Sequence, residues 1–183
     1  SMFESVYEAM ENDSKFCPLV VALPYKHGTL PEGQYKDAGM FEYCEARKIK
    51  VVRGYNKEKD EWLQPLTCDP DYVFFQTPYK FFPPQWSVAR ISMIARVCYI
   101  PYATLLSKGA IAATVHPEGF FKYVSLFFSE CQFKKDLFIR EYENKDWFKK
   151  ENVVLSGHPK LDYLTFKNKL QSNVWKRVVI KNI

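Results

Sequence analysis

Four apolar residues in a row give the clearest signal in the pattern of hydrophobic and polar positions. Residues 72–75, Tyr-Val-Phe-Phe, all favour strands and follow an Asp-Pro-Asp segment that is typical of turns. Such a continuous run predicts a strand buried on both faces, as in a parallel sheet covered by helices. We therefore expect this strand to deliver Gln76, Thr77 and Tyr79 to the edge of a sheet where α/β proteins bind ligands, although these residues also suit a simple polar turn.

The rest of the chain alternates between strand and helix patterns. Apolar runs predict further strands at residues 16–23, 49–53, 97–102, 120–128, 153–155 and 178–180. Helical spacing predicts helices at residues 3–10, 34–48, 61–63, 86–95, 131–142, 145–150 and 160–170, and residues 103–118 are ambiguous. This order is typical of a single α/β domain over residues 1–183, Rossmann-like and doubly wound, with a mainly parallel sheet of about six strands and helices on both faces.

Composition narrows the class of protein. The chain is 47% hydrophobic and 26% charged, so we expect a sizeable core and no extended disorder. The net charge of +5 is mild and Lys and Arg never occur more than two in a row, which argues against a nucleic-acid partner. No apolar run approaches the ~18 residues that a transmembrane helix needs. The five cysteines form no CxxC pair, so we expect reduced, mostly buried thiols in a cytosolic protein.

Signatures of nucleotide, hydrolase and metal sites are missing from the sequence. No GxGxxG or GxSxG motif occurs, and Gly28 and Gly33 lack the following Lys that a phosphate loop needs. No cluster of His, Cys and Asp has the spacing of a metal site, so we expect neither a metal nor a cofactor. Asp69 and Asp71 form a DxD pair, but the pair precedes its strand and is expected at the opposite edge of the sheet.

Two histidines follow predicted strands. His27, in Lys-His-Gly-Thr, is placed for a general base because imidazole titrates near neutral pH, and an exposed loop histidine is the alternative. His158 lies in Ser-Gly-His-Pro-Lys, where Gly157 permits a positive φ and Pro159 can begin a helix. The free N–H groups of that helix and Lys160 suit a phosphate, or the segment is only a tight structural turn.

Three segments resemble one family of enzymes. Residues 153–164, VVLSGHPKLDYL, resemble the strand followed by (T/S)-G-x-P-(R/K)-x-D-x-L of CDP-glycerol glycerophosphotransferase-like proteins, the relatives of teichoic acid primases and polymerases. Residues 71–79, DYVFFQTPY, and residues 95–102, ARVCYIPY, look like two further segments of bacterial members of this family. The three segments occur in the order found in the family.

The resemblance implies a GT-B architecture, in which two Rossmann-like domains face a cleft. This chain would be the N-terminal, acceptor-side domain, and residues 175–183 would begin the crossing to a second domain that binds the CDP-activated donor. The implied activity moves a polyol phosphate from that donor to a glycan or lipid-linked acceptor during the synthesis of cell-envelope polymers. We accordingly expect the protein in the cytoplasm or at the inner face of the membrane.

The resemblance also implies roles for individual residues. His27 matches the proposed base in the family's Trp-His-Gly-Thr-Pro-Leu-Lys motif, although Lys26 replaces the tryptophan and the Pro-Leu order is reversed. The residues expected to contact the acceptor are Gln76, Thr77, Tyr79 and Tyr102. Because the donor half would lie elsewhere, we expect the domain to be inactive alone. The alternative function is a non-catalytic binding or interaction domain of a polysaccharide-biosynthesis protein.

Overall fold

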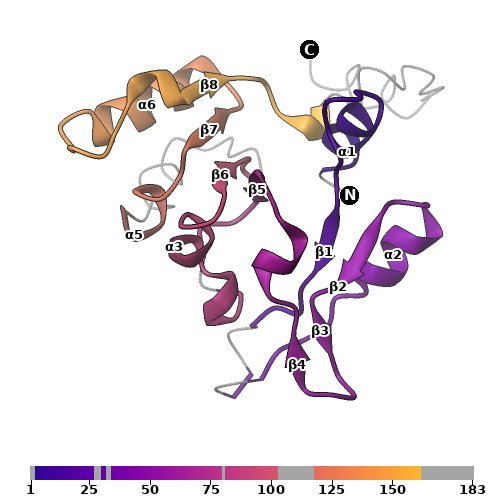
Figure 1. The fold of residues 1–183 in the computed structure, drawn as a ribbon. Coiled ribbons are helices and arrows are strands. Elements are labelled where there is room, and N and C mark those ends of the chain that lie inside the picture. Colours follow the sequence, from indigo (N-terminus) through magenta and orange to yellow (C-terminus); the bar gives the residue numbers. More distant parts are fainter. Residues whose placement is uncertain (1–2, 27–29, 32–33, 80, 103–117, 162–183) are drawn as a thin grey trace, which may run out of the picture.

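A parallel sheet of four strands forms the centre of the fold. The computed structural model describes residues 3–26, 30–31, 34–79, 81–102 and 118–161. The strands are β5 (Tyr72–Phe75), β6 (Arg96–Tyr99), β7 (Leu126–Ser129) and β8 (Val153–Leu155), and they pair in the order in which they occur in the chain. Figure 1 shows them following one another from the middle of the molecule to its upper end.

One face of this sheet carries the hydrophobic core. A single row of paired residues, Phe75, Tyr99, Phe127 and Val153, crosses all four strands, and each of the four is at most 7% exposed. The rings of Phe127 and Phe138 stack at the centre of this core, with centroids 4.0 Å apart and planes 12° apart. Since side chains alternate along a strand, this row fixes the register of the whole sheet.

Helices cover that same face. They are α3 (Val88–Ile91), α5 (Glu118–Phe121) and α6 (Gln132–Tyr142), which contribute Ile91, Phe121 and Phe138 to the core. Consecutive parallel strands that lie side by side require their right-handed connections to pass over one face, which explains the one-sided cover. On the opposite face the rings of Phe74 and Phe128 lie 6.4 Å apart and remain partly exposed.

The N-terminal part of the chain forms two smaller sheets. Helix α1 (Glu4–Glu11) precedes β1 (Val20–Ala22), which pairs in parallel with β2 (Val51–Arg53) after helix α2 (Met40–Ala46). Strands β3 (Tyr55–Asn56) and β4 (Glu61–Trp62) form an antiparallel hairpin. Val21 and Leu23 pack against the core of the four-stranded sheet, so the small parallel sheet adjoins the larger one. Short 3-10 turns occur at Pro65–Cys68, Pro84–Trp86 and Lys150–Asn152.

The mixed α/β class predicted from the sequence is confirmed, with one change. Within the part of the chain described here, six parallel strands are present, but four form one sheet and two another, instead of one continuous sheet of six. Strand β5 and helix α6 lie within one residue of their predicted bounds. The predicted strand at 178–180 and the crossing at 175–183 lie outside the described residues.

Several predicted elements are wrong or shorter. The predicted helix at 61–63 is wrong: Glu61–Trp62 form strand β4, and Trp62 packs on Tyr55 and Tyr35, with ring centroids 4.6 and 4.9 Å apart, which stabilises the hairpin. Residues 145–150 form no α-helix, and Trp147 in this segment folds back onto Tyr142. The predicted helix at 34–48 is limited to Met40–Ala46.

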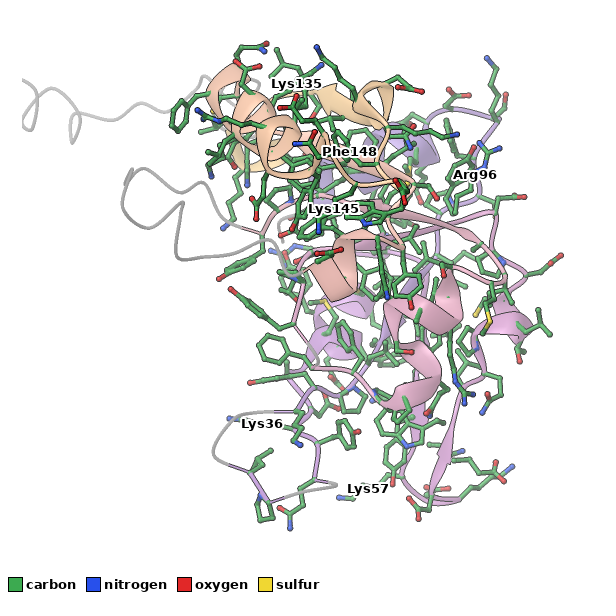
Figure 2. All side chains as sticks on the ribbon, turned by 90° about the vertical axis from the view of Figure 1, so that its left-hand side faces the viewer. Lys36, Lys57, Arg96, Lys135, Lys145 and Phe148 are labelled. Atoms are coloured by element: carbon green, nitrogen blue, oxygen red, sulfur yellow. The ribbon has the colours of Figure 1, made fainter. Side chains whose placement is uncertain are left out.

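Further expectations concern the cysteines, membrane-spanning helices and surface charge. All five thiols are free, but only Cys44 and Cys98 are buried, whereas Cys17 and Cys131 are exposed, so the prediction of mostly buried cysteines is wrong. No helix in the described ranges is long and apolar enough to cross a membrane. Figure 2 shows Lys36 and Lys57 at one end of the molecule and Lys135 and Lys145 at the other, so these cations form no single basic patch.

Candidate functional site at the carboxyl edge of the sheet

The ends of β5 and β6 bring predicted acceptor residues together. The N–H of Ile100 donates to the carbonyl of Phe75 at 3.0 Å, and the N–H of Tyr102 donates to the carbonyl of Gln76 at 3.1 Å. Pairing therefore continues past the last residue of each strand. As a result, Gln76 and Tyr102 lie side by side at the edge where parallel sheets usually bind ligands.

Two tyrosines form the exposed part of this edge. The phenols of Tyr79 and Tyr102 are hydrogen-bonded to each other, and their residues are 37% and 43% exposed. Burial of part of its ring, and then the neighbouring Tyr102 phenol, raise the pKa of Tyr79. Tyr99 lies beneath them and is 6% exposed, so burial raises its pKa strongly. The phenols of Tyr79 and Tyr99 are therefore neutral hydrogen-bonding groups at ordinary pH.

Thr77 differs from its neighbours. Its Oγ1 is buried and has no hydrogen-bond partner. The residue was predicted to contact an acceptor from an exposed edge, but its hydroxyl points into the protein. It lies at the same end of the sheet as Gln76, and the residue as a whole is half-buried although its hydroxyl is not accessible.

The turn after β8 has the geometry that its sequence predicts. Gly157 has a φ of +80°, and the helical residues that follow begin at Pro159. His158 is 2% exposed, and its Nδ1 accepts a hydrogen bond from the N–H of Lys160 at 3.2 Å. His158 thus caps the start of the helix with its side chain, as Asn or Asp does elsewhere. Figure 1 shows this turn beside α1, and Ser5 Oγ donates to the carbonyl of Pro159 at 3.3 Å.

The tautomer of His158 follows from this bond. Because Nδ1 accepts, the neutral ring carries its proton on Nε2. Burial lowers the pKa of His158, while the Glu130 carboxylate and the Pro101 carbonyl oppose that shift and Lys160 and Lys134 support it. The neutral ring therefore predominates at neutral pH. Its Nε2 is buried, and the backbone carbonyl of Pro101 is the acceptor that faces the ring.

Glu130 is the functional candidate that sequence reasoning missed. It lies between β7 and α6, its side chain is 6% exposed, and one oxygen pairs with Nζ of Lys134, whose side chain is 13% exposed. The other oxygen, Oε2, is buried without a partner. The signal was present in the sequence, since Ser129-Glu130 follows a buried strand and a lysine lies four residues further on.

The remaining predicted residues lie elsewhere. His27, the candidate base, lies outside the described residues, but the preceding Lys26 donates its N–H to the carbonyl of Phe81 at 2.7 Å. The ring of Phe81 packs on Tyr79 with centroids 5.2 Å apart, so the chain reaches residue 26 beside the tyrosine edge. Asn56 ends β3, and its Oδ1 accepts the N–H groups of Glu58 and Lys59 within the β3–β4 hairpin.

No cluster of three or more His, Cys, Asp and Glu that could hold a metal ion occurs among the residues that the structure describes.

Comparison with known proteins does not assign the chain to a family. No family model, no curated protein and no solved structure matches the chain.

Proposed function

We propose that this chain is the acceptor-side domain of a GT-B-type transferase that moves polyol phosphate from a CDP donor to a glycan or lipid-linked acceptor. The resemblance of three segments to CDP-glycerol glycerophosphotransferase-like proteins motivates the proposal. The observation that carries it is the edge at which Gln76, Tyr79 and Tyr102 meet. These residues offer neutral donors and acceptors suited to the hydroxyl groups of a glycan.

The proposal includes one doubly wound, Rossmann-like sheet in which β1 lies next to β5. Val21 and Leu23 contact the core beneath the four-stranded sheet, and Lys26 is hydrogen-bonded to Phe81, which follows β5. His27 remains the proposed base on the resemblance of Lys-His-Gly-Thr to the motif of the family, and its role would be to accept the proton of a hydroxyl held by Tyr79 and Tyr102.

The proposed reaction is an in-line displacement. An acceptor hydroxyl oxygen attacks the β-phosphorus of the CDP donor, its proton passes to the base, and the bond between the β-phosphorus and the bridging oxygen breaks to release CMP. In this proposal the second domain binds the donor. The chain contains no phosphate-loop motif, which supports this division between the two domains.

Calorimetric titration tests this division. We expect the chain to bind a soluble glycerol phosphate oligomer, used as acceptor, and to bind CDP-glycerol and CMP only in the millimolar range or more weakly, about 4 kcal/mol at most. Gln76→Ala and Tyr79→Ala should weaken oligomer binding. Tyr72→Ala is the matched control, because Tyr72 is 43% exposed at the other end of the same strand.

Two results would contradict the proposal. One is a micromolar site for CDP-glycerol, or CMP release that disappears in His27→Ala, because either places a complete active site in this chain. The other is the absence of oligomer binding.

A second function is favoured by the exposure of Tyr79 and Tyr102, since exposed phenols bind hydroxylated ligands without any reaction. The chain would then be a non-catalytic binding domain of a polysaccharide-biosynthesis protein. The reading frame beyond Ile183 distinguishes the two functions. A second Rossmann-like pattern of about one domain's length favours the transferase, and its absence favours the binding domain.

A further inference from the structure

A cysteine and a lysine on the surface meet beside the small parallel sheet. Nζ of Lys50 donates a hydrogen bond to Sγ of Cys17 at 3.5 Å, and both residues are exposed. The thiol is free, and the two residues lie 33 positions apart in the chain. Thiol and amine side chains are both nucleophiles that form covalent bonds with carbonyl carbons. The fold therefore brings two different nucleophiles together at a place that is open to solvent.

The backbone holds this pair in place. The N–H of Val20 donates to the carbonyl of Lys50 at 2.9 Å, and Val20 pairs with Val51 in the register of β1 and β2. The N–H of Lys50 donates to the phenol oxygen of Tyr7 at 2.9 Å, so both backbone groups of Lys50 are bound. Cys17 lies three residues before Val20. The contact between sulfur and nitrogen is thus a consequence of the strand pairing.

The distance between the two atoms restricts the chemistry. Groups held about 3–3.5 Å apart react as if they were highly concentrated, because the entropy of bringing them together is already lost. An acyl group on Sγ of Cys17 would place its carbonyl carbon within reach of Nζ of Lys50. One thiol and one amine are too few protein ligands for a zinc ion. Lys15 and Lys48 each lie two residues from a member of the pair in the chain, so the local charge favours an anionic acyl carrier.

We propose that Cys17 and Lys50 form a site at which acyl thioesters modify Lys50 by transfer from sulfur to nitrogen. First, the Cys17 thiolate attacks the carbonyl carbon of the thioester, and the bond from that carbon to the sulfur of the carrier breaks to release the carrier as its thiolate. The neutral amine of Lys50 then attacks the same carbon. The carbon–nitrogen bond forms, the bond to Sγ breaks, and the proton lost by the nitrogen passes to the departing sulfur. The products are an amide at Lys50 and a regenerated Cys17 thiol, and neither step depends on the proposed transferase.

Acetyl-coenzyme A is the probe that tests the site, and the folded chain is the sample. Peptide mass spectrometry measures the initial rate of acetylation at each lysine, with a phosphine present to keep the thiols reduced. Lys57 and Lys59 are exposed in the turn of the β3–β4 hairpin (Lys57 is labelled in Figure 2), so they report direct acetylation by the probe. Lys50 should be acetylated at least about ten times faster than either, because its acyl donor is held beside it.

Two variants separate the two steps. Cys17→Ser keeps a small polar side chain but forms no thioester, so acetylation of Lys50 should fall to the rate of Lys57. Lys50→Arg keeps a positive charge beside the sulfur but cannot accept the acyl group, so a thioester on Cys17 should accumulate and be released by hydroxylamine. Cys131→Ser is the control, because Cys131 is also exposed, and it should leave the rate at Lys50 unchanged.

Unfolding distinguishes the site from the ordinary reactivity of a lysine. In concentrated urea the pairing of β1 with β2 is lost, so Lys50 should react no faster than Lys57. Four results would overturn the proposal. They are equal rates at Lys50 and Lys57 in the folded protein, an unchanged rate at Lys50 in Cys17→Ser, the absence of a thioester on Cys17 in Lys50→Arg, and a faster reaction of Lys50 that persists in urea.

Discussion

At the scale of single residues, His158 should make the stability of the protein depend on pH. Its folded-state pKa is lowered from the ordinary 6.5, so the unfolded chain takes up a proton as the pH falls below 6.5 while the folded chain resists it. The free energy of unfolding should therefore decrease between pH 6.5 and 5, by at most about 1.4 kcal/mol per pH unit for this one proton. Its full contribution is present above pH 6.5.

Urea unfolding at pH 5.5, 6.0 and 7.5 measures this effect. His158→Asn should show a smaller loss of stability across the same interval, because the titrating ring is gone and the cap is kept. The carboxyl groups of Glu4, Glu42 and Glu118 have pKa values lowered from 4.5, so their contributions are lost only at more acidic pH. An identical pH dependence in His158→Asn and in the parent would show that the ring does not carry the effect.

The cysteines provide a second prediction for individual residues. Burial raises the pKa of Cys98 to about 11 and also raises that of Cys44, so both are almost entirely protonated at pH 8. An aromatic disulfide reagent should label the exposed Cys17 and Cys131 first, and label Cys44 and Cys98 only as the protein unfolds. Peptide mapping after brief labelling identifies the modified thiols. Rapid labelling of Cys98 in the folded protein would contradict its burial.

The exposed residues of the candidate site were predictable, and the buried ones were not. Gln76 and Tyr102 directly follow apolar runs, and the structure places them together at the ends of β5 and β6. Glu130 follows a buried strand in the same way, but nothing in the sequence indicates that one of its oxygens lacks a partner. That property depends on Lys134 and on the neighbouring strand, which only the folded protein brings together.

At the scale of elements, Gly54 controls the contact between β2 and β1. A Cβ on Gly54 would collide with the Leu23 side chain and lie 3.1 Å from the carbonyl oxygen of Ala22, which accepts the Gly54 N–H. Gly54→Ala should therefore lower the free energy of unfolding by ~1–3 kcal/mol. Equilibrium unfolding in urea is the measurement.

The matched control is Gly119→Ala, which is expected to raise the free energy of unfolding instead of lowering it. A Cβ on Gly119 meets nothing within 4 Å, and the residue lies in helix α5, so Gly119→Ala should stabilise the protein by up to ~1 kcal/mol. Equal effects of the two substitutions would show that the close approach of Leu23 to Gly54 is unimportant.

Element prediction succeeded where local pattern and tertiary contacts agree. Strand β5 has an uninterrupted apolar run and α6 has regular spacing of its buried residues, and both were predicted from the sequence. Residues 61–63 were predicted to be helical from a weak local pattern. In the structure, the aromatic contacts of Trp62 with Tyr35 and Tyr55 stabilise a hairpin instead. The contact with Tyr35 joins residues that are distant in the sequence.

For the whole molecule, Phe127 lies at the centre of the hydrophobic core. It stacks on Phe138 and contacts Phe121 and Tyr99, with ring centroids 4.0, 5.7 and 5.5 Å away. Phe127→Ala should lower the free energy of unfolding by about 3–5 kcal/mol in urea titration, because it removes this packing and leaves a cavity.

Phe133→Ala is the control for the loss of a phenylalanine. Phe133 is 50% exposed on α6, so its removal should change stability by no more than about 0.5 kcal/mol. A loss of less than about 1 kcal/mol in Phe127→Ala would mean that the core relaxes around the missing ring.

The fold class was predictable from alternating strands and helices, but the division into sheets was not. Hydrophobic runs identify strands without stating which of them pair. The separate β1–β2 pair arises from backbone contacts such as that between Gly54 and Ala22, whereas Val21 and Leu23 meet the larger sheet through side chains. Side-chain contact of this kind leaves no periodic signal in the sequence.

The order of the strands in the larger sheet has a consequence for how the protein is made. Because β5, β6, β7 and β8 pair in the order of the chain, each strand finds its partner in the segment synthesised just before it. The sheet can then grow one strand at a time as the chain leaves the ribosome, with small loop-closure costs at each step. Glu130 and His158 follow β7 and β8, so the part of the edge that they form would be assembled last.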